Sequence, residues 1–152
     1  MDLTFRLATI DDLSEVVRML TDDFLGRTRE RYEDPLPESY VNAFREIEGD
    51  PNNELIVAEA GDEVVGTLQL TFTPSISFKG GRRATVESVR VNEQHRGKGI
   101  GREIMLWAID RAKEKGCVSM QLTTNLERMD ARRFYENLGF SGTHLWMKIK
   151  LK

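Results

Sequence analysis

A strand, a glycine loop and a helix follow one another without a break between residues 83 and 116, and this unit constrains the fold more than any other stretch. The segment "RATVESVRV" predicts a strand. The loop "QHRGKGIGR" has glycine at positions 97, 99 and 101. A helical stripe then runs through Ile100, Ile104, Ala108 and Ala112 and stops at Gly116. Amide groups at a helix start lack partners within the helix and lie at the positive end of its dipole, so the unit predicts a phosphate-binding site.

The spacing of the glycines distinguishes between kinds of phosphate site. Arg96, Lys98 and Arg102 add positive charge, and glycine lets the backbone approach a ligand and adopt positive φ. A Walker loop requires Ser or Thr after Gly-Lys, but Gly99 follows Lys98. A dinucleotide-binding fingerprint requires glycine at its sixth position, which is Arg102 when counted from Gly97. Both nucleotide motifs fail, which leaves another phosphate ligand or a tight turn with solvated basic side chains.

Upstream of this unit, the patterns predict a strand, two helices and a hairpin. We expect a strand in "LTFRLA" and a helix capped by Thr9, with its apolar face formed by Leu13, Val16, Val17 and Leu20. Residues 26–38 lack periodicity and contain two prolines, which predicts a loop, and a second helix is expected over 39–48. The strands "ELIVAEA" and "EVVGTLQLTF" form the hairpin, and their alternation places on one face Val64, Leu68, Leu70 and Phe72.

Downstream, we expect a short buried strand in "CVSMQLT", a helix over about 127–137 that stops at Gly139, and a last strand. In that strand, Trp146, Lys148 and Lys150 alternate with four apolar residues, which are Leu145, Met147, Ile149 and Leu151. The order β-α-α-β-β-β-α-β-α-β predicts an α/β fold of the α+β kind, with one mixed sheet flanked by helices, in a single domain over 1–152.

Composition limits the functions that the chain can have. Its 152 residues suffice for one core without disulfide or metal staples, and a net charge of -3 argues against nucleic acid as a partner. Cys117 is the only cysteine, which excludes an internal disulfide and a cysteine-based metal site. The N-terminal sequence has no leader pattern and no stretch is apolar enough to span a bilayer. We therefore expect a cytoplasmic protein with no metal and no membrane or nucleic-acid partner.

Two separated motifs resemble those of the GCN5-related N-acetyltransferase (GNAT) superfamily. Its acetyl-CoA loop has Arg or Gln, two residues, Gly, one residue, then Gly or Ala, which matches Arg96, Gly99 and Gly101. Gln94, Gly97 and Gly99 fit too, but the first register lies directly against the predicted helix. The second motif, "DARRFYENLGF", is similar to the C-terminal block in which Tyr stands four residues before Gly-Phe. The resemblance implies the GNAT fold, with a sheet splayed between two parallel strands, "ATVESVRV" and "CVSMQLT".

The resemblance also implies that acetyl-CoA lies across this splay. Backbone groups around Val89, Arg90 and Val91 would pair with the pantetheine arm, and the pyrophosphate would be held by Arg96, Gly97, Lys98, Gly99, Ile100, Gly101 and Arg102. Many members have an asparagine that contacts the pantetheine three residues before the alanine of the second block. Arg128 stands at that position here, and Asn125 nearby is the candidate substitute.

Acetylation of an amine requires a base, because an alkyl ammonium group has a pKa of about 10, by analogy with lysine. Glu87 is the candidate, since strict alternation places it on the same face as Val89 and Val91, beside the thioester that the resemblance implies. Burial among apolar residues would raise its pKa towards a useful value. The alternative is a salt bridge from Glu87 to Arg82, Arg83 or Arg90.

Tyr135 matches the family position of the general acid, which would protonate the leaving thiolate, and packing is the alternative role. A backbone amide at or near Val89 is the expected oxyanion donor. His95 and His144 belong to no recognisable catalytic motif, and we expect Cys117 to be inert. The resemblance thus implies an N-acetyltransferase that uses acetyl-CoA and acts on a primary amine of a small molecule or peptide by direct attack in a ternary complex. Residues 26–50 and 73–82 would border the acceptor. A non-catalytic acyl-CoA sensor and a homodimer stay open.

Overall fold

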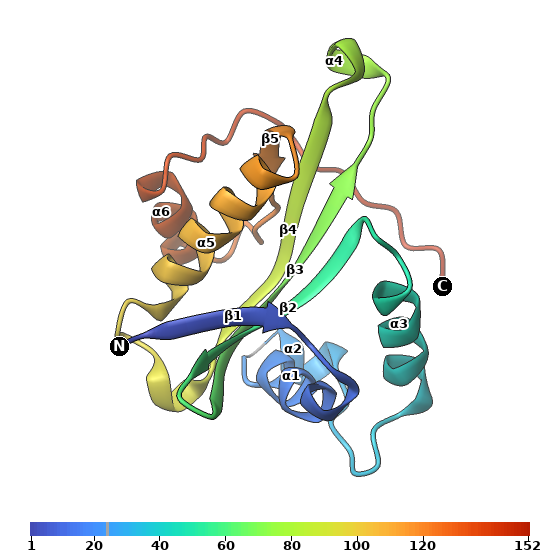
Figure 1. The fold of residues 1–152 in the computed structure, drawn as a ribbon, viewed down its shortest axis with the longest axis vertical. Coiled ribbons are helices and arrows are strands. Elements are labelled where there is room, and N and C mark those ends of the chain that lie inside the picture. The colour runs from blue at the N-terminus through green and yellow to red at the C-terminus, as the bar shows by residue number, and fades with distance from the viewer. Residues whose placement is uncertain (24) are drawn as a thin grey trace.

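In the computed structural model, which describes residues 1–23 and 25–152, these residues form a five-stranded sheet with the order β1-β2-β3-β4-β5 (Figure 1). Neighbouring strands are antiparallel except for β4 and β5, which are parallel. The strands are β1 (Leu3–Leu7), β2 (Asn53–Ala60), β3 (Glu63–Thr73), β4 (Arg82–Val91) and β5 (Cys117–Gln121). This arrangement confirms the mixed sheet expected from the order of the elements.

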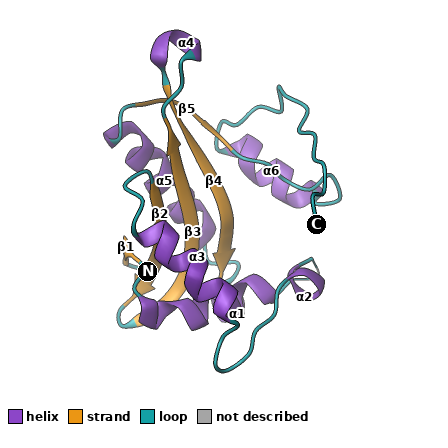
Figure 2. Ribbon diagram, turned by 90° about the vertical axis from the view of Figure 1, so that its right-hand side faces the viewer, coloured by secondary structure: helices purple, strands orange, loops and turns teal. Residues whose placement is uncertain are grey.

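Helices cover both faces of the sheet (Figures 1 and 2). On one face α1 packs against β3 and β4, and α3 packs against β2; on the other, α5 contacts β3, β4 and β5. The helices are α1 (Leu13–Thr21), α2 (Gly26–Arg29), α3 (Glu38–Glu48), α4 (Ser77–Gly80), α5 (Ile100–Glu114) and α6 (Met129–Asn137), with short 3-10 turns η1 (Ile10–Asp12) and η2 (Glu93–His95).

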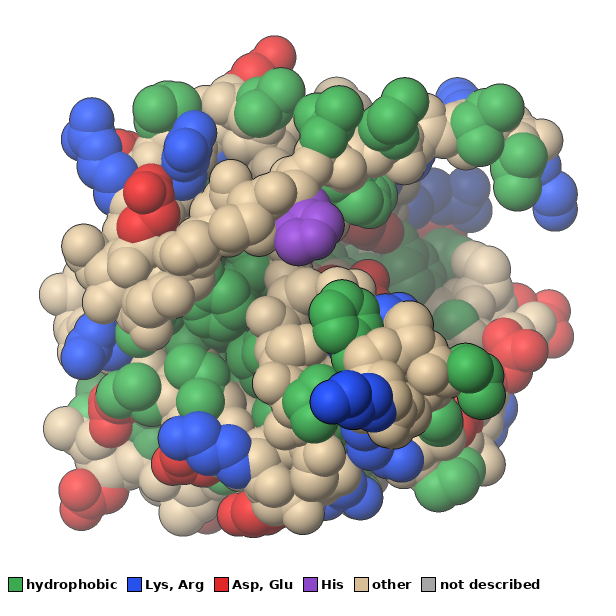
Figure 3. Space-filling model, turned by 90° about the horizontal axis from the view of Figure 1, so that it is seen from above, with side chains coloured by type: hydrophobic (Ala, Val, Ile, Leu, Met, Phe, Trp, Pro, Cys, Tyr) green, Lys and Arg blue, Asp and Glu red, His purple; other side chains and the backbone are tan. Residues whose placement is uncertain are grey.

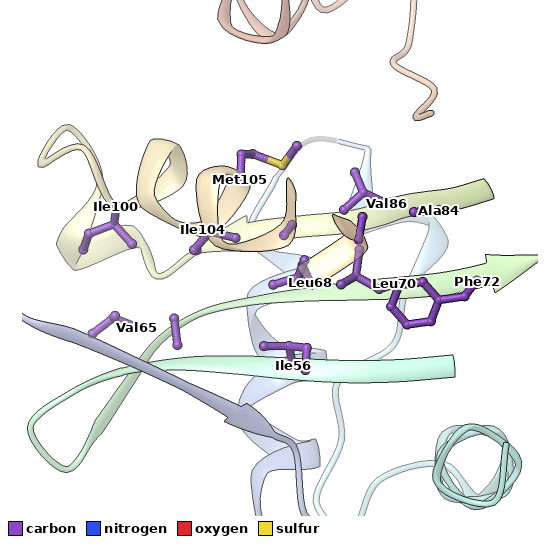
Figure 4. Close-up of a cluster of buried hydrophobic side chains, with 13 residues drawn as sticks. Ile56, Val65, Leu68, Leu70, Phe72, Ala84, Val86, Ile100, Ile104 and Met105 are labelled. Atoms are coloured by element: carbon purple, nitrogen blue, oxygen red, sulfur yellow. The ribbon is translucent and has the colours of Figure 1, made fainter. Parts of the chain in front are cut away.

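Two hydrophobic clusters lie on the two faces of the sheet. The larger one joins the inner stripe of α5 to β2, β3 and β4 (Figure 4), and Leu68, Leu70, Ile104 and Met105 are fully buried in it. The smaller one joins α1 to α3 through Leu13, Val17 and Phe44. The helical stripes predicted for α1 and α5 are therefore the faces that these helices bury.

The start of α1 is stabilised by charge as well as by the packing of Leu13. The Asp12 carboxylate accepts a hydrogen bond from the Thr9 amide at 2.7 Å and binds Arg6 Nη1 at 2.7 Å. The second guanidinium nitrogen of Arg6 contacts Glu59 on β2 at 2.7 Å. Thr9 thus precedes the helix as expected, and Asp12 links this end of α1 to the sheet.

A bulge in the β2–β3 hairpin corrects one predicted face. The pairing shifts between Ala58, opposite Gly66, and Glu59, opposite Val64, so Val65 is the extra residue. Val65 joins the core cluster with Leu68, whereas Val64 is only half-buried. The alternation that placed Val64 in the core is therefore wrong by one residue.

Two further expectations need correction. The segment 26–38, expected to be a loop throughout, begins with the short helix α2, whose Gly26 amide is capped by Asp23. The last strand, expected from the alternation after Gly139, is not formed: residues 141–152 are extended but pair with no strand among the described residues. Over the part of the chain that the structure describes, no helix is long and apolar enough to cross a bilayer.

Candidate active site

Strands β4 and β5 separate halfway along β4. They pair from Arg82, opposite Cys117, to Thr85, opposite Gln121, and β4 then continues to Val91 without a neighbour on that side. Backbone groups of residues 86–91 therefore border an opening between two parallel strands. This is the splay that the sequence motifs implied, and it ends at the glycine loop.

A second bulge lies within β4, beside this opening. Gln69 on β3 pairs with Glu87 and Thr67 pairs with Arg90, so the three residues 67–69 of β3 face the four residues 87–90 of β4. Ser88 has φ of 56°, in the left-handed region that non-glycine residues seldom adopt. A strained residue of this kind reverses the alternation of side chains along the strand.

The bulge corrects the position predicted for Glu87. Val86, Val89 and Val91 all pack on the large core cluster, so Glu87 points to the opposite face. Its side chain is exposed rather than buried in an apolar row, and no ion pair to it is found among the described residues. The alternative role, a salt bridge to Arg82, Arg83 or Arg90, is therefore not formed either. Glu87 therefore lacks the burial on which its role as a base was predicted, although it lies beside the bulge.

The glycine loop has the backbone conformation that its sequence predicted at two of its three glycines. Gly97 and Gly99 both have φ of 78°, and a Cβ built on either would meet no atom within 4 Å, so conformation rather than crowding requires glycine there. Gly101 lies inside α5, where an added Cβ would approach Phe134 Cζ at 3.6 Å. Helix α5 begins at Ile100, so the amides that follow Gly99 face outward, as an anion site requires.

The basic side chains of the loop are free to move towards a ligand. Arg96, Lys98 and Arg102 are exposed, and Arg96 Nε makes one 3.3 Å contact with the carbonyl oxygen of Val91. The carbonyl oxygen of Val89 likewise accepts a hydrogen bond from Arg90 at 2.9 Å. Two backbone acceptors along the opening are thus occupied by arginine side chains that a pantetheine amide could replace.

Asn125, the candidate substitute for the missing pantetheine-contacting asparagine, lies in the loop before α6. Its side-chain oxygen accepts a hydrogen bond from the Glu127 amide at 2.9 Å, and its carbonyl oxygen accepts one from the Arg128 amide at 2.9 Å. Asn125 therefore orders the turn that leads into α6, and only its side-chain amide nitrogen is left to donate to a ligand.

Tyr135 lies on α6 within a small aromatic group. Its ring meets those of Phe134 and Phe140 edge to face, at centroid distances of 5.2 and 6.0 Å. The Phe140 amide returns to the Tyr135 carbonyl at 3.1 Å across Gly139, whose φ is 102°. The spacing Tyr-x-x-x-Gly-Phe is thus a helix stop that presses Phe140 onto Tyr135.

Burial raises the pKa of the Tyr135 phenol, and the charges of Arg128 and Arg90 oppose this rise only in part. The hydroxyl is therefore protonated at neutral pH, as a proton donor must be. The same two arginines place positive charge beside the ring. Tyr135 thus has the protonation state that its predicted function needs.

Positive charge gathers around a single carboxylate next to Tyr135. Arg90 Nη2 lies 3.3 Å from Asp23, and both side chains are largely buried. Burial pushes the pKa of Asp23 up, but the Gly26 amide and the charges of Arg90, Arg128 and Arg29 together hold it below its ordinary value. Arg90 Nε and one oxygen of Asp23 have no hydrogen-bond partner among the described residues. The cluster carries more positive than negative charge and has unused donors.

A cavity of about 140 Å³ opens on the other side of the bulge, between the sheet and helices α1 and α3. It is mostly apolar, and its wall includes Gln69 and Ser88. Since Glu87 pairs with Gln69 in the sheet, Glu87 shares the face on which the cavity lies. The structure brings the bulge, the cavity and the carboxylate together on the face opposite Val89 and Val91.

Sequence reasoning missed Ser88, Asp23 and the positive charge that Arg128 brings close to Tyr135 and Asp23. The sequence of β4 did carry a signal for the bulge, because its apolar residues change from even positions, Ala84 and Val86, to odd ones, Val89 and Val91. Arg128 was noticed only as a departure from the family pattern, and Asp23 lies far from it in sequence. No local signal could have joined these residues, since the sheet brings them together.

The histidines and the cysteine have ordinary surroundings. His95 Nε2 lies 3.1 Å from Glu63, and the His144 ring contacts the neighbouring Thr143 hydroxyl at 2.7 Å. Cys117 begins β5 and is half-buried. Among the residues that the structure describes, no three His, Cys, Asp or Glu side chains are grouped so that they could hold a metal ion.

Known proteins are similar to this chain in sequence and in fold. A crystal structure of a transcriptional regulator from Bacillus halodurans C-125 is 56% identical, with a TM-score of 0.95 over 99% of this chain and 100% of that one. A predicted acetyltransferase from Clostridium acetobutylicum, solved with acetyl-CoA, is 20% identical, has a TM-score of 0.75, and aligns over 99% of this chain and 97% of that one. This second likeness shows the fold alone.

The aminoalkylphosphonate N-acetyltransferase of Salmonella typhimurium is 30% identical over 95 residues, which are 62% of this chain and 61% of that protein. The chain thus spans less than two thirds of the length of this relative. The sequence profile of the Acetyltransferase (GNAT) family, whose members use acetyl-CoA, matches residues 15–140. That match covers the splay, the glycine loop and the Tyr135 helix, so this chain belongs to the Acetyltransferase (GNAT) family.

Proposed function

We propose that the protein transfers the acetyl group of acetyl-CoA to a primary amine of a small molecule or peptide, by direct attack in a ternary complex. One observation supports this most: the bulge of β4 borders both the opening towards β5 and the cavity, and Arg90 beside the bulge lies close enough to Tyr135 for its charge to act on the phenol. A thioester held in the opening would have an amine on one side and a proton donor on the other.

The coenzyme would be held mainly by the main chain. The free edge of β4 around Val89, Arg90 and Val91 suits the two amides of a pantetheine arm, and Arg90 and Arg96 would release the carbonyl oxygens that they now contact. Amides from Arg96 to Arg102 would bind the pyrophosphate at the start of α5, with charge from Arg96, Lys98 and Arg102. The bound thioester supplies the activated acetyl group.

Glu87 would accept the proton of the attacking amine, directly or through a water molecule. It lies on the face with the cavity, so an amine entering from that side would pass the carboxylate before it meets the thioester. The nitrogen–carbon bond forms as the proton leaves for Glu87. The backbone amide at or near Val89 would stabilise the charge on the carbonyl oxygen.

Tyr135 would then give its proton to the departing thiolate as the carbon–sulfur bond breaks. Its half-buried, protonated phenol suits this step. The phenolate left behind lies near Arg90 and Arg128, whose charges favour it until it recovers a proton. Atoms balance, because one proton leaves the amine and one reaches the thiol.

The acceptor would carry an anionic group as well as its amine. The excess positive charge of Arg90 and Arg128 around Asp23, with an unpaired buried guanidinium nitrogen, suits a phosphonate, phosphate or carboxylate. The aminoalkylphosphonate acted on by the Salmonella relative is an amine of this kind. The apolar cavity would receive the carbon chain.

A panel of matched amines tests this function by thiol release from acetyl-CoA. We expect turnover with 2-aminoethylphosphonate, phosphoethanolamine or β-alanine, and less with ethanolamine, which lacks the anion. Arg128→Gln should raise KM for the anionic amines about tenfold or more. The exposed Arg45→Gln on α3 should not alter KM. Equal turnover of ethanolamine would contradict the anion site but not acetyl transfer itself.

Glu87→Gln tests the proposed base. Turnover should fall about a hundredfold or more and lose the limb that rises with pH, while acetyl-CoA binds as before. Glu46→Gln, an exposed change on α3, should leave the pH profile unaltered. An unaltered profile in Glu87→Gln would assign the base to another carboxylate.

A non-catalytic acyl-CoA sensor is the second candidate, because the 56% identical crystal structure carries the name of a transcriptional regulator. A sensor would bind acetyl-CoA, seen as a rise in melting temperature, and release no thiol with any amine of the panel. Thiol release with one amine would exclude a purely sensing function.

A further inference from the structure

Residues 141–152 form an arm, here called the C-terminal arm, that extends away from α6 without joining the sheet (Figures 1 and 2). Every residue of the arm is exposed. The exposed fractions of its large apolar side chains are 84% for Leu145, 82% for Met147, 81% for Ile149 and 88% for Leu151. Figure 3 shows hydrophobic side chains in a row along one edge of the molecule.

The arm has the sequence of a half-buried strand. Four large apolar residues alternate with Trp146, Lys148 and Lys150, which is the period of a strand with one face covered. Contiguous exposed apolar surface of this size is unfavourable in water and marks an interaction site. The apolar side chains of the arm therefore need a surface to pack against. Their alternation with polar side chains indicates that the arm pairs with the edge of a sheet and packs one face on its core.

Strand β5 offers such an edge. It is the last strand of the sheet, and among residues 1–23 and 25–152 it pairs only with β4, which leaves the backbone groups on its outer side without a strand partner. Apolar side chains stand exposed next to it: Val118 at 65%, and Ile76 and Phe78 on the β3–β4 tip at 97% and 77%. The Cβ position of Gly81 lies close to both Val118 and Phe78, so the tip and β5 form one surface.

The core is also open beside β5 and α6. Helix α6 has no buried residue, although its Phe134 and the following Leu138 pack against the large cluster, whereas five residues of α5 are buried. Met120 and Leu122, in and after β5, are likewise only half-buried. An added strand along β5 would cover these side chains and close the cluster.

We propose that the C-terminal arm of each molecule adds as a strand to β5 of a second copy, so that two copies exchange their arms. A second copy must carry both the arm and the free edge, and twofold symmetry lets each edge receive one arm. The arm comprises 12 of 152 residues, and the 56% identical crystal structure superposes with a TM-score of 0.95 over 99% of this chain. A score this high indicates that the C-terminal segment of that protein follows the same path as the arm. This inference does not depend on the proposed activity.

The exchanged arm would also complete the site. Tyr135 and its neighbours Phe134 and Phe140 lie in the open part of the cluster. Covering them would remove water from the side of the opening that β5 borders. The partner's arm thus stabilises the region from which the proposed proton donor acts.

Molar mass measured by light scattering during gel filtration tests the exchange first. The intact chain should have twice the chain mass at micromolar concentration. The double variant Met147→Glu with Ile149→Glu should raise the dimer Kd about a hundredfold or more. Lys148→Ser with Lys150→Ser changes the other face and should leave the dimer intact. A monomeric intact chain, or a dimer that withstands both glutamates, would overturn the exchange.

The single native cysteine makes a sharper test possible. Cys117 lies in β5 and packs on the large cluster, so it shares a face with the apolar row of an added strand. In separate single variants, Leu145, Met147, Ile149 and Leu151 are each changed to Cys and oxidised. At least one should form a covalent dimer on a non-reducing gel, because cysteines opposite each other on neighbouring strands can form a disulfide.

Two controls identify the link. Adding Cys117→Ser should abolish the covalent dimer, which excludes a bond between two arms. Lys148→Cys, on the other face, should not form it with Cys117. A disulfide inside one chain would mean that the arm folds back on its own β5, and no Cys117 link at any of the four positions would mean that it pairs elsewhere; either result overturns the exchange. These single substitutions decide the question even if the double glutamate variant fails to fold.

Discussion

Helices α5 and α6 contribute to one core cluster, yet only α5 is buried in it. Five residues of α5 are buried, and none of α6 is. The β4–loop–α5 half of the site is closed by the sheet, while the β5–α6 half is open along an unpaired edge. The difference teaches that apolar spacing decides which face of a helix is hydrophobic, but the number of neighbouring elements decides whether that face is covered.

The two halves also have different proposed tasks. The closed half offers backbone amides fixed at the start of α5, and the open half offers a side chain, Tyr135. Binding by the main chain depends on conformation, so it should be sensitive to changes at glycine. Proton transfer depends on one hydroxyl, so it should be sensitive to the loss of that atom alone.

The largest effect is expected from Gly99→Asp in the closed half. Its carboxylate would stand beside the pyrophosphate, and like charges in contact cost several kcal/mol, so acetyl-CoA affinity should fall about a thousandfold or more. Gly61→Asp is the matched control, because Gly61 also has positive φ, 63°, and open space around its Cβ position, but lies at the β2–β3 turn. Calorimetry should show loss of binding in the first variant alone. Equal loss in both would mean that strain, not the ligand site, is responsible.

Tyr135→Phe should act on the open half without disturbing the closed one. Removing the hydroxyl leaves the edge-to-face contacts with Phe134 and Phe140, so the fold and the acetyl-CoA affinity should persist. Turnover should fall about a hundredfold, within the range for general acid catalysis. Tyr32→Phe, an exposed change, should leave turnover unaltered. Full turnover in Tyr135→Phe would reduce Tyr135 to a packing residue.

The sequence predicted the closed half well because its elements are determined locally. The stripe of α5, the stop at Gly116 and the positive φ of Gly97 and Gly99 all depend on residues within a few positions of one another. The family motifs identified the loop and the Tyr135 turn for the same reason.

What the sequence could not predict depends on pairing between strands. The bulges at Val65 and Ser88 change which side chains face the core, and strict alternation therefore placed Val64 and Glu87 on the wrong faces. The arm has the pattern of a strand, but a strand needs a partner edge, and a pattern does not say which molecule supplies it.

The burial of α5 predicts a clear difference in stability along one helix. Ile104 is fully buried, so Ile104→Ala should lower the free energy of unfolding by about 2–5 kcal/mol. Leu106 is 42% exposed on the same helix, so Leu106→Ala should cost less than about 1 kcal/mol. Urea unfolding measures both. Similar losses would mean that α5 is not held by its inner face, and the contrast with α6 would disappear.

A small effect is expected outside both halves, at the start of α1, where an ion pair adds to the packing of Leu13. The Arg6 guanidinium is the main cause that holds the pKa of Asp12 below its ordinary value, against the effect of burial, with help from the Thr9 amide. A carboxyl whose pKa is lower in the folded state stabilises the fold above its unfolded pKa of about 3.9 and loses this contribution as pH falls through the folded value. Because Arg6 is partly exposed, Asp12→Asn should cost only about 1 kcal/mol at pH 7.

The pH dependence separates this pair from the packing of α5. The difference in urea stability between the natural chain and Asp12→Asn should shrink from about pH 5 downwards and vanish once Asp12 is protonated in the folded state. The loss in Ile104→Ala should persist over the same range, because no proton is involved in filling a cavity. If the Asp12→Asn difference stayed constant down to pH 2, the charge of Asp12 would not be what stabilises the start of α1.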